Sequence, residues 1–422
     1  MQSVKKFNIK EHINLYYIND NKYKTVSMSM YLHRKLDKEE VTKNAVLAKV
    51  LKRGTDKYNT IKSLNTHLEE LYGTLYSIDI TKKANVQSIC CTVSNISEKF
   101  SSPELSCKAA GLMMEFLFEP YAPNGVFDKG YVEVEKQNLK DDIDAIINDK
   151  RSFANLRVVE HMCSGEDNAI LECGYVDDIP KINNENLFNH YKSIVNTSPI
   201  DIFVVGNVDI GGIVEYIKNY LDTISFDIKP IEIKGSLKKA GEPKYVDEVM
   251  NVNQGKLAMG FRTEIDGNNP LYYALLVGNS IYGAGAHSKL FNNVREKMSL
   301  AYYASSRLDR FNGLMIVSSG IEFSNYEKAR DEIMVQLDAV KCGDFTQEDI
   351  KVAKNYIINS YKSYLDSSYL MKDFYLAMSF SGTHDTLEDA IKKVETVTKE
   401  DVVSAFSSVN LDTVYFLKGE EA

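Results

Sequence analysis

Apolar residues follow two different spacings along the chain, and together they predict mixed α/β structure. Apolar residues at strand spacing predict a strand over 25–33 and a hairpin over 75–93. Helical spacing predicts helices over 42–54 and 60–73. The second helix ends at Gly73, the residue type that most often takes the left-handed conformation after a helix.

The second half of the chain repeats this order of elements. It predicts a strand over 256–264, helices over 271–283 and 289–297, and a hairpin over 301–320. Each half also closes with an apolar strand that ends at a glycine. These two closing strands read SPIDIFVVGNVD (198–209) and LDTVYFLKGE (411–420).

A second internal match lies upstream of the closing strands. Phe127 and Phe345 each stand in a loop before apolar residues at helical spacing. Aligning Phe127 with Phe345 keeps nearly the same register as aligning Gly206 with Gly419. We therefore predict an α+β fold built from two duplicated mixed α/β domains.

One composition shift separates the two halves. Residues 226–247 gather proline, glycine and lysine with little periodicity, which is typical of an exposed linker. The sequence therefore predicts an N-terminal domain over 1–225, a linker over 226–247 and a C-terminal domain over 248–422.

Composition and charge exclude several classes of function. The 422 residues carry a formal net charge of −9 and no basic block, which argues against binding nucleic acid or an anionic membrane. No apolar run is long enough to span a bilayer, and the first residues lack the apolar core of a secretory signal. Six cysteines without a C-x-x-C motif argue against a thiolate zinc site. We expect a cytoplasmic chain with reduced thiols.

Several motifs resemble the pitrilysin/insulinase family of metallopeptidases. They are LFNNVREKMSLAYYASS (290–306), the preceding GAGAHSKLF, and the strand endings VVGNVD and YFLKG. The family includes the mitochondrial processing peptidase and the inactive core proteins of a respiratory complex. The resemblance covers nearly the whole chain and implies two such domains in a clamshell arrangement. Active members carry H-x-x-E-H on the first long helix, shortly before Lys-Gly-Thr or Arg-Gly-Thr.

The metal motif is degenerate in this chain. The Arg-Gly-Thr triplet is present at 53–55, but Ala45 and Lys49 stand where the two histidine ligands belong. Ala48 stands at the general base, and the resemblance places Asp142 at the third ligand. A methyl group offers no lone pair, and a protonated lysine repels a dication. We therefore expect no metal and no other cofactor in this chain.

The second half keeps a different part of the family pattern. Members that work with a catalytic partner carry an arginine followed seven residues later by a tyrosine, and Arg295 and Tyr302 match that spacing. A phenol can donate to a carbonyl oxygen as it becomes an oxyanion, and a guanidinium can hold the peptide. The resemblance implies that Arg295 and Tyr302 orient a substrate. The alternative is a surface ion pair and a half-buried strand residue.

These observations support two main hypotheses. In the first, the chain is the non-metal subunit of a heteromeric zinc metallopeptidase. Its partner would be a paralogue that carries H-x-x-E-H and the zinc, and its substrate a peptide or unfolded polypeptide. In the second, it is an inactive peptide-binding or assembly protein, for example an accessory to elongation factor P modification. A homodimer is compatible with either. A peptidase active alone would need zinc at a site outside the family pattern.

Overall fold

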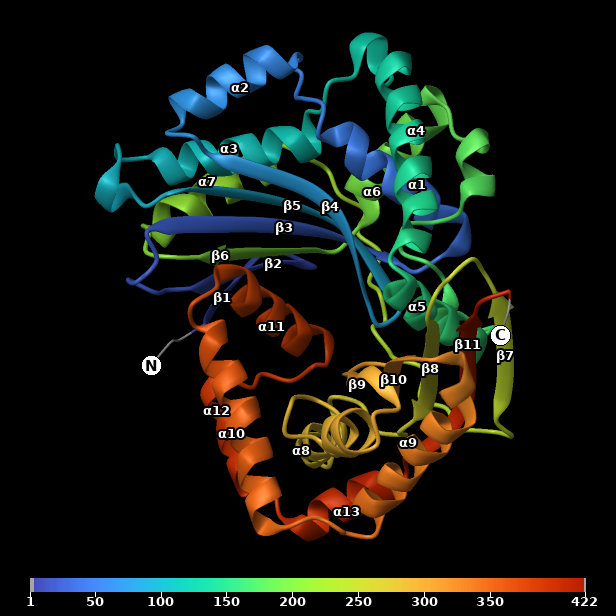
Figure 1. Ribbon diagram of the computed structural model, residues 1–422. Helices are drawn as coiled ribbons and strands as arrows, with labels where there is room; N and C mark the ends of the chain where they lie inside the picture. Colours follow the sequence, from blue (N-terminus) through green and yellow to red (C-terminus); the bar gives the residue numbers. More distant parts are fainter. Residues whose placement is uncertain (1–3, 421–422) are drawn as a thin grey trace. The chain divides into compact units, whose positions relative to one another are not determined.

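Each half of the chain builds its own β-sheet in the computed structural model, which describes residues 4–420 (Figure 1). The strands of the first sheet are β1 (Val4–Lys10), β2 (Ile13–Ile18), β3 (Thr25–Lys35), β4 (Leu75–Lys83), β5 (Val86–Ile96) and β6 (Ile200–Val205). Those of the second are β7 (Lys244–Val249), β8 (Gly255–Arg262), β9 (Ala301–Asp309), β10 (Leu314–Ile321) and β11 (Asn410–Lys418). Helices accompany both sheets, so the predicted α+β fold is confirmed.

The helices follow the two halves in the same way. The first half contains α1 (Lys38–Leu51), α2 (Ile61–Glu70), α3 (Leu105–Phe118), α4 (Lys129–Ala145), α5 (Lys150–Met162), α6 (Asn184–Thr197) and α7 (Ile210–Asp222). The second contains α8 (Tyr272–Tyr282), the π-helix η6 (Leu290–Lys297), α9 (Tyr326–Lys341), α10 (Gln347–Tyr364), α11 (Ser368–Phe380), α12 (Leu387–Thr396) and α13 (Lys399–Ser407). Short 3₁₀ turns are η1 (Glu98–Phe100), η2 (Pro123–Gly125), η3 (Ile146–Asn148), η4 (Asp167–Ala169), η5 (Val176–Lys181) and η7 (Phe323–Asn325).

Strand order confirms the internal duplication. The first sheet has the order β1-β2-β6-β3-β5-β4, and the second has the order β7-β11-β8-β10-β9. In each sheet the closing strand pairs in parallel with one neighbour and antiparallel with the other: β6 with β2 and β3, and β11 with β7 and β8. Each sheet continues through an antiparallel hairpin, β5-β4 in the first and β10-β9 in the second. Only β1 has no counterpart among the described strands.

The ends of the predicted helices shift by a few residues. Gly73 has φ +71°, as predicted for the residue after a helix. Helix α1 begins at Lys38, earlier than predicted, because Asp37 accepts a hydrogen bond from the backbone N–H of Glu39 at 2.8 Å and caps it. It ends at Leu51, before Gly54, whose φ of +147° lies outside helical geometry.

The two compact units of the molecule differ from the two halves of the sequence, because each unit includes a segment from the other half. One unit comprises residues up to 144, 170–232 and 368–373, and the other comprises 145–169, 233–367 and the chain from 374 onward. A division into the contiguous ranges 1–225, 226–247 and 248–422 does not describe this exchange. The reason is that α5 packs on β8, β10 and β11, so it belongs with the second sheet.

The exchange is reciprocal. Side chains of α5 join a core cluster of the second sheet: Ala154, Val158 and Met162 pack with Ala258, Leu314, Ile316, Tyr415 and Leu417. The first six residues of α11 (Ser368–Asp373), a helix that follows α10 as α5 follows α4, belong to the first unit. There the buried Lys372 donates to the hydroxyl of Ser29 at 2.8 Å. Duplicated helices thus occupy matching places in the two halves.

The predicted linker is only partly irregular. Residues 226–243 have no helix or strand, but 244–247 begin β7, which pairs in parallel with β11. The expectation of a linker over those last residues was therefore wrong. Because β7 lies at a sheet edge and is exposed at most positions, including Tyr245 and Val249, it lacks the apolar alternation that marks a half-buried strand.

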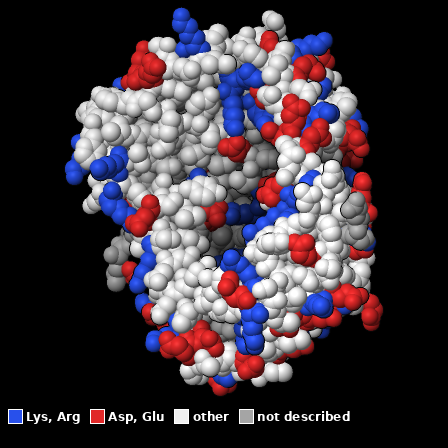
Figure 2. Space-filling view, in the orientation of Figure 1, with Lys and Arg blue, Asp and Glu red and all other residues white. Residues whose placement is uncertain are grey.

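No helix among residues 4–420 is long and apolar enough to cross a membrane. Figure 2 shows basic and acidic side chains mixed over much of one face of the molecule, with a broad area at its upper left that carries few of either.

Candidate functional site

The positions of the degenerate metal motif lie on α1 and α4 of the first unit. Ala45 and Ala48 are buried, each 3% exposed, within the core between α1 and the first sheet. Lys49 is more accessible, and its ammonium nitrogen lies 2.5 Å from Oδ2 of Asp142 on α4. An ion pair therefore joins the two residues that the sequence places at a histidine ligand and at the carboxylate ligand.

A second ion pair joins the end of α1 to α4. Arg53, just after α1, pairs with the carboxylate of Glu135 on α4, which is only 6% exposed. Asn138 donates to the other carboxylate oxygen of Glu135 at 3.0 Å, and the Arg53 guanidinium lies 5.4 Å from the ring centroid of Tyr131. Both acidic groups of α4 that face this end of α1 are thus neutralised by cations.

The described residues hold no group of three or more His, Cys, Asp or Glu side chains that could bind a metal ion. His67, in the sequence HLEEL, stacks on Tyr58 with ring centroids 4.1 Å apart and pairs with Glu70 at 3.3 Å. These contacts are ordinary interactions of a histidine on a helix surface.

Arg295 and Tyr302 lie in the second unit, on either side of a turn. Arg295 belongs to η6, and its guanidinium lies 4.6 Å from the ring centroid of Phe291 and 3.6 Å from the carboxylate of Glu296. Tyr302 belongs to β9 and is 58% exposed. No hydrogen bond joins the two side chains in the described part of the chain, so each is held separately.

Tyr302 donates its phenol hydrogen to the carboxylate of Glu322. This hydrogen bond, together with the negative charge of Glu322, raises the pKa of Tyr302 above its ordinary value of 10.0. The phenol therefore keeps its proton at neutral pH and can act as a hydrogen-bond donor. Sequence reasoning missed Glu322, but the β9-β10 hairpin could have indicated it, since Glu322 directly follows the strand that pairs with Tyr302's strand.

The π-helical geometry of η6 determines the position of Arg295. The segment is a π-helix, and the backbone N–H of Met298 bonds to the carbonyl of Asn293, five residues earlier, at 3.0 Å. Leu290 and Val294 are the buried anchors of this segment. Short π-helical segments are rare and frequently accompany functional sites.

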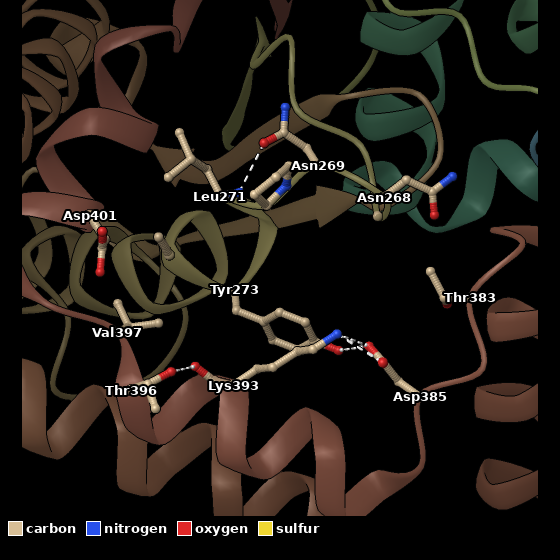
Figure 3. A pocket seen from close by; sticks show the side chains of 13 residues that line it. Asn268, Asn269, Leu271, Tyr273, Thr383, Asp385, Lys393, Thr396, Val397 and Asp401 are labelled. Carbon is tan, nitrogen blue, oxygen red and sulfur yellow. Dashed lines mark hydrogen bonds and ion pairs between the residues drawn. The ribbon is translucent and has the colours of Figure 1, made fainter.

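A separate pocket of about 310 Å³ opens beside the start of α8 in the second unit (Figure 3). Its charged groups already bind one another: Lys393 lies 2.7 Å from Oδ2 of Asp385, and Tyr273 donates to the same oxygen at 3.1 Å. Asp401 accepts hydrogen bonds from Thr398, the N-cap of α13, in a capping box. Each charged group of the pocket thus already has a partner within the protein, and none of them indicates a ligand.

Comparison with known proteins places these features in one family. Residues 181–357 match the family described as "Peptidase M16 inactive domain". The chain is 38% identical over 406 residues to the "Probable inactive metalloprotease YmfF" of Bacillus subtilis strain 168, covering 96% of this chain and 95% of that protein. It is also similar to "Uncharacterized zinc protease YmxG" of the same organism, at 22% identity over 57% of this chain and 56% of that one.

Solved structures show the same fold over the full length. A conserved protein from Enterococcus faecalis V583 superposes with a TM-score of 0.92 at 28% identity, covering 99% of both chains. A peptidase M16 inactive domain from Pseudomonas fluorescens superposes with a TM-score of 0.81 at 16% identity, covering 99% of this chain and 98% of that one.

Proposed function

The chain belongs to the M16 peptidase family, and we propose that it is the zinc-free subunit of a two-subunit peptidase. In this role it would present Arg295 and Tyr302 to a polypeptide held against a paralogous subunit that carries H-x-x-E-H. The observation that carries the proposal is the contrast between the two units. Ion pairs and buried alanines fill the metal positions of the first, while Tyr302 of the second stays exposed.

The residues at the metal positions do not fit zinc. Two of them are buried alanines, and the one carboxylate, Asp142, is already paired with Lys49. A zinc site needs several lone-pair donors around one point, and a lysine ammonium offers none. Chemistry that depends on zinc would therefore come from the partner, where the metal activates a water molecule.

Tyr302 supplies the hydrogen-bond donor that a peptide-cleaving site needs opposite the metal. Its phenol stays protonated, so it can turn from Glu322 and donate to the carbonyl oxygen of the bond being cleaved. Arg295 presents five N–H donors that can hold peptide carbonyls or a carboxylate. In this scheme Glu322 keeps the phenol oriented until substrate replaces it.

One observation favours a second role, in which the protein binds a polypeptide without cutting it. The curated relative that matches nearly the whole chain is called an inactive metalloprotease, and the first unit of this chain lacks the family's metal ligands. An assembly or accessory protein would need the fold and its binding surfaces but no chemistry. Exposure of Tyr302 beside a carboxylate favours the first role, since a scaffold has no need of a held phenol donor.

The experiment that tests the proposal measures peptide cleavage by this chain alone, by an H-x-x-E-H paralogue from the same cell alone, and by their mixture. We expect cleavage to rise at least tenfold in the mixture, together with a complex on gel filtration. A complex that forms without cleaving any peptide would favour the binding role. Near-stoichiometric zinc in the chain purified alone would overturn the assignment of Ala45, Ala48 and Lys49 to the metal positions.

A further inference from the structure

Two cationic side chains of the second unit lie against the ring of Tyr303. Arg151, from the first turn of α5, places its guanidinium carbon 4.2 Å from the ring centroid. Lys256, from β8, places its ammonium nitrogen 5.9 Å from the same centroid. Arg151 also donates to the hydroxyl of Ser305 on β9 at 2.9 Å. The group therefore joins one helix and two strands of the same unit.

The pairing of the strands fixes the ring of Tyr303 in this place. Tyr303 pairs with Gly320 on β10, and Gly320 pairs with Lys256 on β8, so the three residues form one row across the sheet. A Cβ atom on Gly320 would lie 2.5 Å from the ring of Tyr303. Because glycine has no side chain, the ring can lie against the sheet and hold the two cations above it.

Neither cation forms an ion pair with a carboxylate among residues 4–420, although the charge of Asp149 acts on both. Lys256 bonds to the amide oxygen of Gln254. Asp149 itself caps α5, where it accepts hydrogen bonds from the backbone N–H groups of Arg151 and Ser152. Burial, and then the charge of Arg151, lower the pKa of Lys256, while Asp149 acts in the opposite direction. The two positive charges thus repel each other.

The hydroxyl of Tyr303 is buried, which raises its pKa, and a hydrogen bond with Ser318 acts in the opposite direction. A buried hydroxyl does not face a ligand at the surface, so the ring serves as the platform on which the two cations lie. The guanidinium and the ammonium are both hydrogen-bond donors, so their joint requirement is an acceptor with negative charge.

We propose that Arg151 and Lys256, held over the ring of Tyr303, bind a carboxylate of a polypeptide ligand. Carboxylates of two sources share this chemistry: the C-terminal carboxylate of the peptide, and the side chain of Asp or Glu. The inference rests on the proposed function, which supplies a polypeptide as the ligand. It deepens that function by assigning a preference for acidic peptides to the second unit, in which Tyr302 and Tyr303 lie on the same strand, β9.

The test measures equilibrium binding of fluorescent peptides to the full chain without any partner. Three peptides of one neutral sequence are compared: one with a free C-terminus, one amidated, and one amidated with a single internal Glu. We expect at least one of the two carboxylate peptides to bind about tenfold more tightly than the neutral one, since charge-assisted hydrogen bonds are the strong ones. Which of the two binds more tightly identifies the source of the carboxylate.

Variants test the residues directly. Arg151→Gln and Lys256→Gln should each reduce the tenfold preference to about twofold or less, and Tyr303→Phe, which keeps the ring under the cations, should retain it. Lys351→Gln is the matched control, because it removes a lysine of the same unit that pairs with Glu348. It should keep the preference. Circular dichroism checks that each variant is folded, and the comparison among peptides on the unaltered chain does not depend on any variant.

Equal affinity for charged and neutral peptides, no binding of any peptide, or a preference retained in both charge variants would overturn the inference. Its failure is separable from failure of the proposed function, which is judged by cleavage in the mixture with the paralogue. A cleaving mixture whose subunit shows no carboxylate preference overturns this inference alone. A clear preference in a complex that never cleaves leaves the carboxylate site intact and overturns only the catalytic role.

Discussion

The role of the Asp142 carboxylate depends on the residue that faces it. In a metal site it would share a cation with two histidines, whereas here it accepts a hydrogen bond from Lys49. The lysine supplies the positive charge that zinc would otherwise supply. Returning histidine at position 49 alone would not restore metal binding, because Ala45 and Ala48 offer neither a second ligand nor a base.

At the same scale, Tyr302→Phe removes the phenol donor and leaves the ring. We expect turnover by the reconstituted pair to fall about 100-fold, because a single oxyanion donor contributes that much in other enzymes. Complex formation, followed by gel filtration, should be unchanged. Tyr245→Phe, at another exposed tyrosine of the same unit, is the control and should keep full turnover. Unchanged turnover in Tyr302→Phe would exclude the phenol from the reaction.

The carboxylate of Glu166 predicts how stability depends on pH. Burial by itself would raise its pKa, but hydrogen bonds from Arg262, at 2.6 Å, and from Ser236 lower it below the ordinary value of 4.5. The folded state therefore binds fewer protons than the unfolded state. Its contribution is present above about pH 4.5 and is lost as pH falls through the lowered pKa.

Urea unfolding from about pH 7 to pH 3 checks this expectation. Glu166→Gln should be less stable than the unaltered chain at pH 7, and its free energy of unfolding should fall less steeply on acidification. Glu327→Gln, at an exposed carboxylate on α9, should keep the original slope. Parallel slopes for Glu166→Gln and the unaltered chain would contradict the role given to this ion pair.

At the scale of elements, α5 shows that the pattern that predicts a helix does not predict the sheet on which the helix packs. Its residues Ala154, Val158 and Met162 are spaced four apart, so they lie on one face. That spacing predicts a buried face but not the sheet that buries it. Complementary packing determines which sheet buries this face. Gly260 of β8 leaves room for Met162, whose sulfur would lie 2.7 Å from a Cβ at that position.

Met162→Ala should destabilise the second unit by about 2–5 kcal/mol, the range for truncating a buried methionine. Met162 is 2% exposed and packs in the core cluster between α5 and the second sheet. Val335→Ala, on the exposed side of α9, is the matched control and should change stability by less than about 0.5 kcal/mol. Equal effects of the two substitutions would show that α5 contributes little to the stability of this unit.

At the scale of the whole molecule, the exchange of segments makes the two halves depend on each other. The range 1–225 carries α5 without the sheet on which it packs, and 248–422 carries that sheet, apart from most of β7, without α5. Each half made alone would expose apolar surface that is buried in the full chain.

We therefore expect the fragments 1–225 and 248–422 to be poorly folded when expressed separately, and to regain soluble, folded protein when co-expressed. Circular dichroism and thermal unfolding of each fragment and of the pair are the measurements. The fragment 233–422 tests whether restoring β7 and the residues just before it is enough without α5. A fragment 248–422 that unfolds at the temperature of the full chain would contradict the mutual dependence.

Sequence by itself determined the element types, the duplication and the loss of the metal ligands, because these follow from local spacing and from what each side chain can donate. Apolar periodicity located β3, β4, β5 and β6 and their counterparts in the second sheet, but not the parallel partners β2 and β7 that complete the matching order. It also determined that Ala45 and Ala48 cannot bind zinc, whatever surrounds them.

Only the tertiary structure decided what depends on distant segments meeting. The exchange of α5, the edge strand β7, the pairing of Lys49 with Asp142 and the hydrogen bond from Tyr302 to Glu322 all belong to this class. None leaves a local pattern, because each contact joins residues that only the folded chain brings together. The two cations Arg151 and Lys256 over the ring of Tyr303 likewise became visible only once α5 and the second sheet were placed together.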